Sequence, residues 1–275
     1  MSEPRSHESA ITIHATPDDV WRALTDADEL VRWFPLDARV TPGQGGKVWI
    51  SWGAPWEGEG TIAIWEPGRR LRIDQGLVGL TVDYFIEGKG GGGGGETVLR
   101  VVTSGFEKLA NWEDEWDGTK RGWRFELEGL RHYLQHHRGA RRQVAWITTS
   151  VAVSAAAGWS ALLGNGGFFR EGSVDGLKAG ARYRLVSVTG DAIEGVVHIN
   201  EPPRDFSGTV AALGNGLIRF TMDHTGMQVW LSAWGRSQSE IRELEARWAA
   251  KLAELLPDAG VRGRGRLEAA GAAGR

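Results

Sequence analysis

The first half of the chain alternates between apolar and polar residues in short runs, which predicts an antiparallel sheet. An opening strand is expected at residues 10–14, and further strands at residues 46–52, 60–65, 71–74, 80–86 and 97–103. Turn residues separate neighbouring runs, and connections this short favour a meander of antiparallel strands. A helical period closes this half, because Trp123, Leu127, Leu130 and Leu134 recur at helical spacing within residues 119–137.

Two shorter helices are expected between the first strand and the rest of the sheet. Thr16 can cap a helix that has Pro17 at its first position and that carries Val20, Trp21 and Leu24. A second short helix is expected over residues 28–33, because Pro35 prevents its continuation.

The second half of the chain repeats this design. Residues 62–71 and 197–206 each contain an apolar run, a Glu-Pro pair, an Arg and a second apolar run. Trp123 and Trp248 each begin an apolar stripe whose next members follow four and seven residues later. A repeat this long exceeds the roughly 20–50 residues of a solenoid unit, so it indicates two copies of one domain.

The second copy is expected to diverge from the first in one place. A strand over residues 144–153 precedes a helix capped by Ser154, as in the first copy, but the glycine-rich residues 163–169 leave no clear second small helix. A capping box at Ser237 and Glu240 starts the last helix. The intervening strands are expected at residues 182–188, 195–199, 206–211, 217–222 and 228–234.

The pattern predicts an α+β fold with two domains, residues 9–138 and 144–256, followed by a disordered tail over residues 257–275. In each domain a curved antiparallel sheet must cover its apolar face, and the long C-terminal helix is the element long enough to do so. Such packing can leave a cavity between sheet and helix. Six consecutive glycines at residues 90–95 indicate a hairpin tip, since no Gly-Lys-Ser/Thr follows as in a phosphate-binding loop.

Composition narrows the classes of function. A net charge of −3 gives no overall attraction to nucleic acid or to an anionic membrane, and no apolar run approaches a membrane span. The absence of cysteine excludes disulfides and thiol catalysis. The polar N-terminal residues lack the apolar region of a signal peptide, so we expect a cytoplasmic protein. We expect a monomer that contains an intramolecular pseudo-dimer, with no cofactor.

Few residues suggest catalysis or metal binding. His14 lacks an evident orienting carboxylate, and His132 and His136, four apart on a helix, lack an evident third metal ligand. Glu57 and Glu59 can share one strand face, where paired carboxylates can act as acid and base or can simply be solvated. Acids around Trp112 and Trp116 can favour a helix start or rim a pocket. We therefore assign no catalytic residue and no metal site.

The first half resembles the START-like (SRPBCC) superfamily, and within it the C-terminal domain of the activator of the heat-shock protein 90 ATPase. The resemblance covers residues 9–137. It rests on the opening strand with Thr16-Pro17-x-x-Val20-Trp21-x-Ala23-Leu24-Thr25-Asp26, on Leu30-x-x-Trp33-Phe34, on the Trp65-Glu66-Pro67 turn, on Thr103-Ser104-Gly105-Phe106 and on Gly122-Trp123. The second half resembles a divergent copy. The resemblance implies a helix-grip fold with an apolar cavity, but the superfamily hosts several functions, so it implies no single reaction.

The 14 tryptophans are expected mainly to fill the cores. From the resemblance we expect a non-enzymatic or weakly enzymatic protein that binds a small hydrophobic molecule in the first domain. The second domain would be mainly structural. Two alternatives stay open: an enzyme of the polyketide-cyclase type that uses Glu57 and Glu59, and a protein-interaction module like a co-chaperone. The residues expected to line the cavity are Trp33, Phe34, Trp49, Trp52, Tyr84, Trp123 and Leu127.

Overall fold

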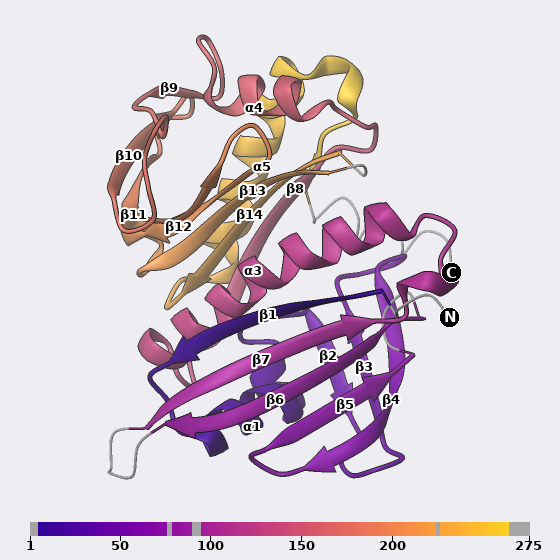
Figure 1. Cartoon of the computed structure of the whole chain (residues 1–275). Coiled ribbons are helices and arrows are strands. Elements are labelled where there is room, and N and C mark those ends of the chain that lie inside the picture. The colour runs from indigo at the N-terminus through magenta and orange to yellow at the C-terminus, as the bar shows by residue number, and fades with distance from the viewer. Residues whose placement is uncertain (1–4, 76–78, 90–94, 224–225, 264–275) are drawn as a thin grey trace. The chain divides into compact units, whose positions relative to one another are not determined.

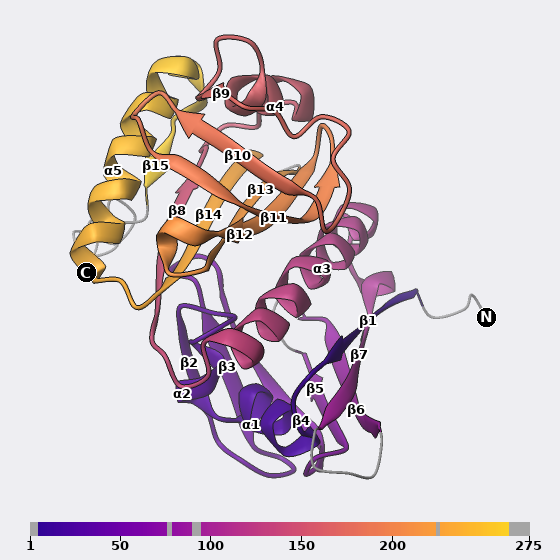
Figure 2. The same ribbon diagram turned by 90° about the vertical axis from the view of Figure 1, so that its left-hand side faces the viewer.

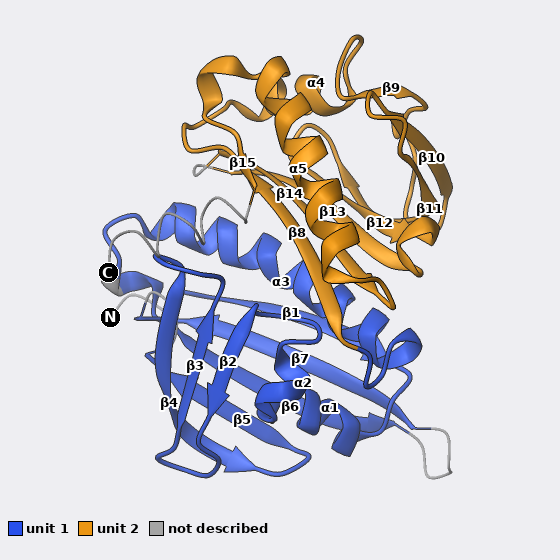
Figure 3. Cartoon of the chain, turned by 180° about the vertical axis from the view of Figure 1, so that it is seen from behind, with its two compact units in different colours: residues 1–140 blue, residues 141–275 orange. Residues whose placement is uncertain are grey.

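The computed structural model describes residues 5–75, 79–89, 95–223 and 226–263. The chain divides into two compact units, residues 1–140 and 141–275 (Figure 3). The six-glycine segment falls largely on residues 90–94, which lie outside the described residues. Each unit is an antiparallel sheet with a long helix at its C-terminal end, so the predicted α+β fold with two helix-grip domains is confirmed.

Unit 1 is built on a sheet whose described strands follow the order β1-β7-β6-β5-β4-β3-β2. Its last helix, α3, runs along this sheet (Figure 1). The elements of unit 1 are β1 (Ser6–Ile13), α1 (Pro17–Thr25), α2 (Ala27–Leu30), β2 (Asp37–Val40), β3 (Lys47–Ser51), β4 (Glu57–Glu66), β5 (Arg70–Asp74), β6 (Thr81–Lys89), β7 (Glu96–Ser104), the 3-10 helix η2 (Phe106–Lys108) and α3 (Trp112–His136).

Unit 2 has the strand order β15-β8-β14-β13-β12-β11-β10-β9 among its described residues. Helix α4 lies at one end of this sheet near β9 (Figure 2). The elements of unit 2 are β8 (Arg142–Thr148), α4 (Ala155–Leu163), β9 (Phe169–Glu171), β10 (Arg182–Ser187), β11 (Ala192–Glu201), β12 (Asp205–Val210), the 3-10 helix η3 (Ala211–Leu213), β13 (Gly216–Asp223), β14 (Gly226–Trp234), α5 (Gln238–Leu255), the 3-10 helix η4 (Pro257–Ala259) and β15 (Arg262–Gly263).

The two sheets have the same connectivity, as the sequence repeat predicts. In each unit the first strand, β1 or β8, returns to pair with the last long strand, β7 or β14. The repeated Glu-Pro motif even carries the same irregularity. The register between β4 and β5 shifts between Ile62 and Ile64, and the register between β11 and β12 shifts between Val197 and Ile199. In both units the shift begins four residues before the Glu of the motif and ends two residues before it.

Helix starts follow the predicted capping residues, with two differences in unit 1. Helix α2 begins at Ala27, before the expected start, because the Asp26 side chain accepts hydrogen bonds from the backbone N–H groups of Asp28 and Glu29. It ends at Leu30, so Trp33 and Phe34 follow the helix instead of ending it. Helix α3 begins at Trp112, and the acidic residues predicted to precede it form its first turn.

Unit 2 lacks a helix between α4 and β10, and the short strand β9 takes its place. Residues 257–263, expected in a disordered tail, instead form η4 and β15. Strand β15 pairs with the free edge of β8, with Arg262 opposite Thr148 and Gly263 opposite Ile147. An edge strand that is covered in this way offers fewer unpaired backbone groups to other chains.

Each long helix turns its apolar stripe toward its own sheet. In unit 2, helix α5 lies against the sheet (Figure 3). Its residues Ile241, Leu244, Trp248 and Leu252 belong to a single buried cluster with residues of the sheet. Leu255, which the repeat placed on this stripe, is 36% exposed. No helix among the described residues combines the length and the apolarity that a membrane crossing requires.

A buried histidine connects β1 to α3 in unit 1. His7 is 6% exposed, and its Nε2 lies 2.9 Å from the Thr119 hydroxyl. That hydroxyl donates to the Glu115 carbonyl at 2.6 Å, so Nε2 carries the proton and donates to Thr119. Burial, and to a lesser extent the nearby Lys120 ammonium, lowers the pKa of His7 from 6.5 to about 4.

Acid is therefore expected to destabilise unit 1 through His7. The unfolded chain binds a proton at His7 below pH 6.5 and the folded chain only near pH 4, so the unfolding free energy falls as the pH decreases through this window. Because water partly screens the group, we expect a loss of about 1–2 kcal/mol, less than the full shift implies. Urea unfolding at pH 7 and pH 4.5 measures it, with His7→Leu as control. Equal pH dependence in both proteins would contradict this role for His7.

Candidate ligand site

Five of the seven residues expected to line a cavity form one connected group of aromatic rings in unit 1. The Phe34 ring is at the centre: its centroid lies 5.1 Å from the Trp33 ring, 5.1 Å from the Trp52 ring and 5.8 Å from the Trp123 ring. Trp123 also contacts Tyr84 edge to face, with centroids 5.7 Å apart. We call Trp33, Phe34, Trp52, Tyr84 and Trp123 the aromatic cluster.

Polar contacts fix two of the indoles in this cluster. The Trp33 Nε1–H donates to the Ala23 carbonyl in α1 at 2.9 Å, and the Trp123 Nε1–H donates to the Thr103 hydroxyl in β7 at 2.9 Å. Because a buried indole N–H needs an acceptor, these bonds determine how each ring is oriented. The cluster therefore joins the segment after α2, the sheet and α3.

Part of the cluster reaches solvent. Trp33, Tyr84 and Trp123 are buried, whereas Phe34 and Trp52 are only half-buried. On the strands, Val82 lies opposite Thr103 and Ile73 lies opposite Val82, so these apolar side chains share the inner face with Tyr84, and both Ile73 and Val82 are half-buried. The inner face of the sheet is thus partly open beside the rings.

Tyr84 is the member of the aromatic cluster that carries a hydroxyl. Its side chain is 6% exposed, and its hydroxyl is not one of the fully buried polar atoms that lack a partner among the described residues. Burial raises the pKa of Tyr84, so the hydroxyl keeps its proton at neutral pH. The hydroxyl can therefore donate a hydrogen bond to an acceptor on a molecule that packs against the rings.

The two remaining residues of the expected set differ in position. Leu127 is 3% exposed and lies one helical turn beyond Trp123 on α3. Trp49 lies on the opposite face of β3 from Val48, where the Arg39 guanidinium carbon is 4.4 Å from its ring centroid. Because β3 alternates, Trp49 cannot share the inner face with Trp52 in its present register, and we leave it out of the proposed site.

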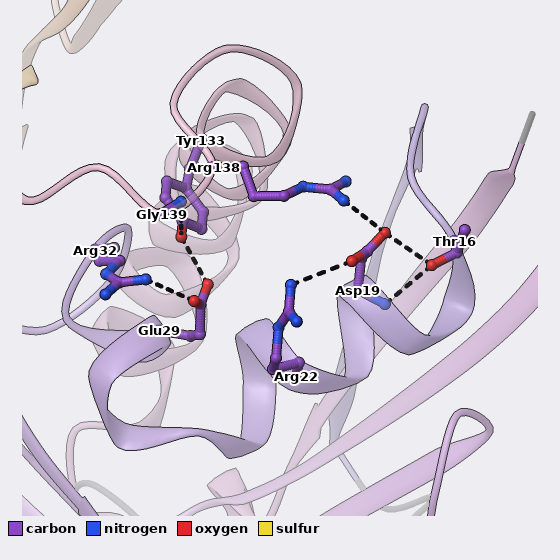
Figure 4. A network of polar contacts seen from close by, with 8 residues as sticks. All are labelled: Thr16, Asp19, Arg22, Glu29, Arg32, Tyr133, Arg138 and Gly139. Atoms are coloured by element: carbon purple, nitrogen blue, oxygen red, sulfur yellow. Dashed lines mark hydrogen bonds and ion pairs between the residues drawn. The ribbon is translucent and has the colours of Figure 1, made fainter.

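A polar network, shown in Figure 4, holds α2 against the end of α3. The Tyr133 hydroxyl donates to one Glu29 carboxylate oxygen at 2.6 Å, and the Arg32 guanidinium pairs with the other at 2.6 Å. The Gly139 N–H donates to the same tyrosine oxygen at 2.9 Å. Burial, followed by the bond to Glu29, raises the pKa of Tyr133. The network positions α2 and so the adjoining Trp33 and Phe34.

A second part of the network holds α1. Arg138, just after α3, pairs with the Asp19 carboxylate at 2.8 Å, and Arg22 lies 3.3 Å from its other oxygen (Figure 4). Burial alone would raise the pKa of Asp19, but the Thr16 hydroxyl and the Arg138 charge outweigh it and lower the pKa. Asp19 is therefore ionised at neutral pH. The local sequence pattern does not identify Glu29 or Tyr133, because nothing in it indicates that residues 104 positions apart will bond.

In unit 2 the aromatic rings at the corresponding position are all buried. Trp248, the counterpart of Trp123, contacts the rings of Phe168 and Phe169 at centroid distances of 5.0 and 5.7 Å. These three side chains are between 0% and 3% exposed, as are Phe206 and Phe220 beside them. The aromatic residues of unit 2 therefore close its core at the position where those of unit 1 reach solvent.

Glu57 and Glu59 do not face the aromatic cluster. They lie opposite Ser51 and Trp49 on the outer face of the sheet and are exposed. Glu59 is 3.5 Å from the Lys47 ammonium, and Glu57 is 3.3 Å from the Ser51 hydroxyl. This placement gives no support to the acid–base pair that the cyclase alternative requires.

The histidines at the end of α3 come together without forming a metal site. The Nε2 atoms of His132 and His137 are 3.3 Å apart, and the His136 ring centroid is 4.8 Å from that of His132. Even so, no group of three or more His, Asp or Glu residues within the described segments is arranged to hold a metal ion. His14 is exposed beyond the end of β1.

Exposed apolar surface is sparse in the described ranges. The large apolar side chains that are exposed are Trp56 at 39%, Val151 at 53% and Leu255 at 36%. They come from separate segments of the two units. Single exposed apolar residues are normal on a soluble surface and give no support to a protein-docking patch.

Comparison with known proteins finds a family that is similar to most of the first unit. Residues 14–135 match the family model described as "Activator of Hsp90 ATPase homolog 1-like protein". This part of the chain is AHSA1-like. The resemblance to this branch of the START-like superfamily is thereby confirmed for this part of the chain. No curated protein matches the sequence.

Several solved structures resemble the chain. The Aha1 dimer of Colwellia psychrerythraea is 16% identical, and the match covers 49% of this chain and 99% of that one, with a TM-score of 0.41. Protein MLL2253 of Mesorhizobium loti is 23% identical, with coverage of 48% and 98% and a TM-score of 0.41. The di-domain ARO/CYC protein BexL from the BE-7585A biosynthetic pathway is 15% identical, with coverage of 94% and 99% and a TM-score of 0.40.

Proposed function

We propose that the AHSA1-like domain binds a small, mainly apolar molecule against the aromatic cluster. The molecule would lie on the inner face of the sheet beside Phe34 and Trp52, with Trp123 and Leu127 of α3 on its other side. The observation that carries the proposal is the connected group of aromatic rings, in which Phe34 and Trp52 are only half-buried and the Tyr84 ring brings a hydroxyl. Burial keeps this hydroxyl protonated, so it can donate one hydrogen bond to the ligand.

The chemistry of the cluster limits the kinds of ligand that it can bind well. Flat rings offer large apolar area with little conformational freedom, so they favour a rigid aromatic or alicyclic body. One hydroxyl among them favours a single polar acceptor such as a carbonyl oxygen. The ligand's carbonyl would satisfy Tyr84 while its rings pack against Phe34, Trp52 and Trp123. Binding alone requires no catalytic group, and the outward-facing Glu57 and Glu59 supply none.

Two matched probes test this proposal on the full chain. 1-Tetralone has a bicyclic body with one carbonyl, and tetralin has the same rings without it. We expect both to bind and tetralone to bind more tightly. Tyr84→Phe should weaken tetralone binding by up to about tenfold, since one neutral hydrogen bond contributes about 0.5–1.5 kcal/mol. It should leave tetralin unchanged. Calorimetric titration measures both affinities.

Tyr183→Phe is the matched control. Tyr183 lies in unit 2 and donates to the Thr209 carbonyl at 2.7 Å, so its loss should not alter tetralone binding. The proposal fails if neither probe binds saturably, or if Tyr84→Phe and Tyr183→Phe bind tetralone equally well. Native mass spectrometry of protein purified from its own host gives an independent readout, because a retained ligand adds its mass to the chain.

A further inference from the structure

Unit 2 contains a cavity of about 270 Å³ that is separate from the aromatic cluster. It lies between the first half of α5 and the sheet, and η3 closes one side. Apolar side chains form most of its wall: Ile193, Val210, Leu213, Leu231, Ile241 and Leu244. Four charged residues, Asp191, Arg236, Glu240 and Arg247, complete the lining together with Trp248 and two alanines, Ala192 and Ala212.

The two acids of this cavity are already engaged within the protein. Asp191 accepts from the Trp248 indole at 2.8 Å and from the Arg247 guanidinium at 2.9 Å. Burial alone would raise the pKa of Asp191, but these donors and the Thr189 hydroxyl outweigh burial and lower it. Glu240 closes the capping box of α5, where it accepts from the Ser237 N–H at 2.8 Å and from the Ser237 hydroxyl at 2.7 Å.

The two arginines have donors to spare. Arg236 donates to the Ala212 carbonyl at 2.7 Å, and its distance to Glu240, 3.8 Å, is too long for a hydrogen bond. Arg247 is engaged with Asp191 through one nitrogen. A guanidinium has five N–H donors in a planar fork that matches a carboxylate. Both side chains remain partly exposed, at 40% and 48%, so they can turn toward a ligand at the mouth.

We propose that this cavity binds a compact monocarboxylate, with its hydrocarbon part among the apolar residues and its carboxylate on Arg236 and Arg247. We expect the ligand to carry a single negative charge, because Asp191 and Glu240 line the same cavity and would repel a dianion. The size follows from the volume: 270 Å³ corresponds to about nine groups at the roughly 30 Å³ that one water occupies in the liquid. An eight-carbon fatty acid is of this size. The second domain then has a binding role of its own.

Octanoate and 1-octanol are the probes, and the full chain is used throughout. We expect octanoate to bind saturably and at least tenfold more tightly than octanol, because octanol lacks the charge that the guanidinium groups recognise. Arg236→Gln should weaken octanoate binding at least tenfold. Arg184→Gln is the matched control: Arg184 is also an exposed arginine of unit 2, paired at 3.7 Å with Glu194, but it does not line the cavity.

A second variant and a direct readout locate the ligand. Ala192→Phe places a ring at an exposed lining position and should abolish octanoate binding without disturbing the core. In methyl-labelled protein, octanoate should shift the resonances of Ile193, Leu213, Ile241 and Leu244. The proposal is overturned if octanoate does not bind saturably, if Arg236→Gln and Arg184→Gln bind it equally, or if only methyl groups of unit 1 shift. Tetralone binding in unit 1 does not depend on Arg236, so either proposal can fail alone.

Discussion

Replacing Trp123 with alanine is expected to abolish 1-tetralone binding and to lower the unfolding free energy of unit 1 by about 3–5 kcal/mol, the usual cost of removing a buried tryptophan. Trp123 is 8% exposed, and its ring connects Phe34 to Tyr84. Its loss also leaves the buried Thr103 hydroxyl without its indole partner. Removing one ring therefore separates α3 from the sheet at the centre of the aromatic cluster.

A conservative variant separates the loss of the site from a loss of folding. Trp123→Phe keeps an aromatic ring at this position but replaces the indole with the smaller phenyl group, which lacks the N–H, so we expect it to cost about 1–2 kcal/mol and to retain tetralone binding. Hydrogen exchange followed peptide by peptide shows which unit is affected, since opening is measured locally. Unchanged exchange in unit 1 of Trp123→Ala, or unchanged tetralone affinity, would refute the central position given to this residue.

Trp248→Ala is expected to destabilise unit 2 by a similar amount, about 3–5 kcal/mol. Trp248 is 0% exposed and packs against Phe168 and Phe169. Its indole also donates to Asp191. The alanine variant therefore leaves a gap among these buried rings and removes a donor from a carboxylate, two effects that both lower the stability of unit 2.

Trp56→Ala is the control for the predicted destabilisation by Trp248→Ala. Trp56 is 39% exposed in the loop before β4, so its removal leaves little or no internal cavity. We expect its effect to stay within about 1 kcal/mol. Urea unfolding followed by circular dichroism compares the variants, with each transition analysed separately because chains with two units need not unfold in one step. A Trp248→Ala chain as stable as Trp56→Ala would show that the unit 2 core is not closed around this residue.

Local sequence pattern accounts for most elements of this fold. Alternation found the long strands of both units, and the capping residues Thr16, Ser154 and Ser237 start α1, α4 and α5 as expected. The pattern missed β2, whose four residues, Asp37–Val40, are too few to display a period. It also missed β15, because Arg262 and Gly263 carry no strand signal and become a strand only through pairing with β8.

Position on a strand face limited the prediction of the site. Sequence named Trp49 and Trp52 together. Trp49 pairs with Arg39 and Glu59 on the outer face of β3, whereas Trp52, just after β3, contacts the Phe34 ring. Glu57 and Glu59 share a face, as predicted, yet it is the outer one. Alternation along a strand shows which residues share a face of the sheet, but it does not show which of the two faces the helix covers.

The sequence by itself determined the repeat, the caps and the aromatic residues, because each of these depends on neighbours within a few positions or on residue type. Only the tertiary structure decided that the Tyr84 ring contacts Trp123, that Tyr133 bonds Glu29, and that Arg236 borders an apolar cavity in unit 2. These contacts join side chains from segments that are far apart in the sequence. Burial makes polar contacts matter more for stability, and these side chains become buried only when the helix packs on the sheet.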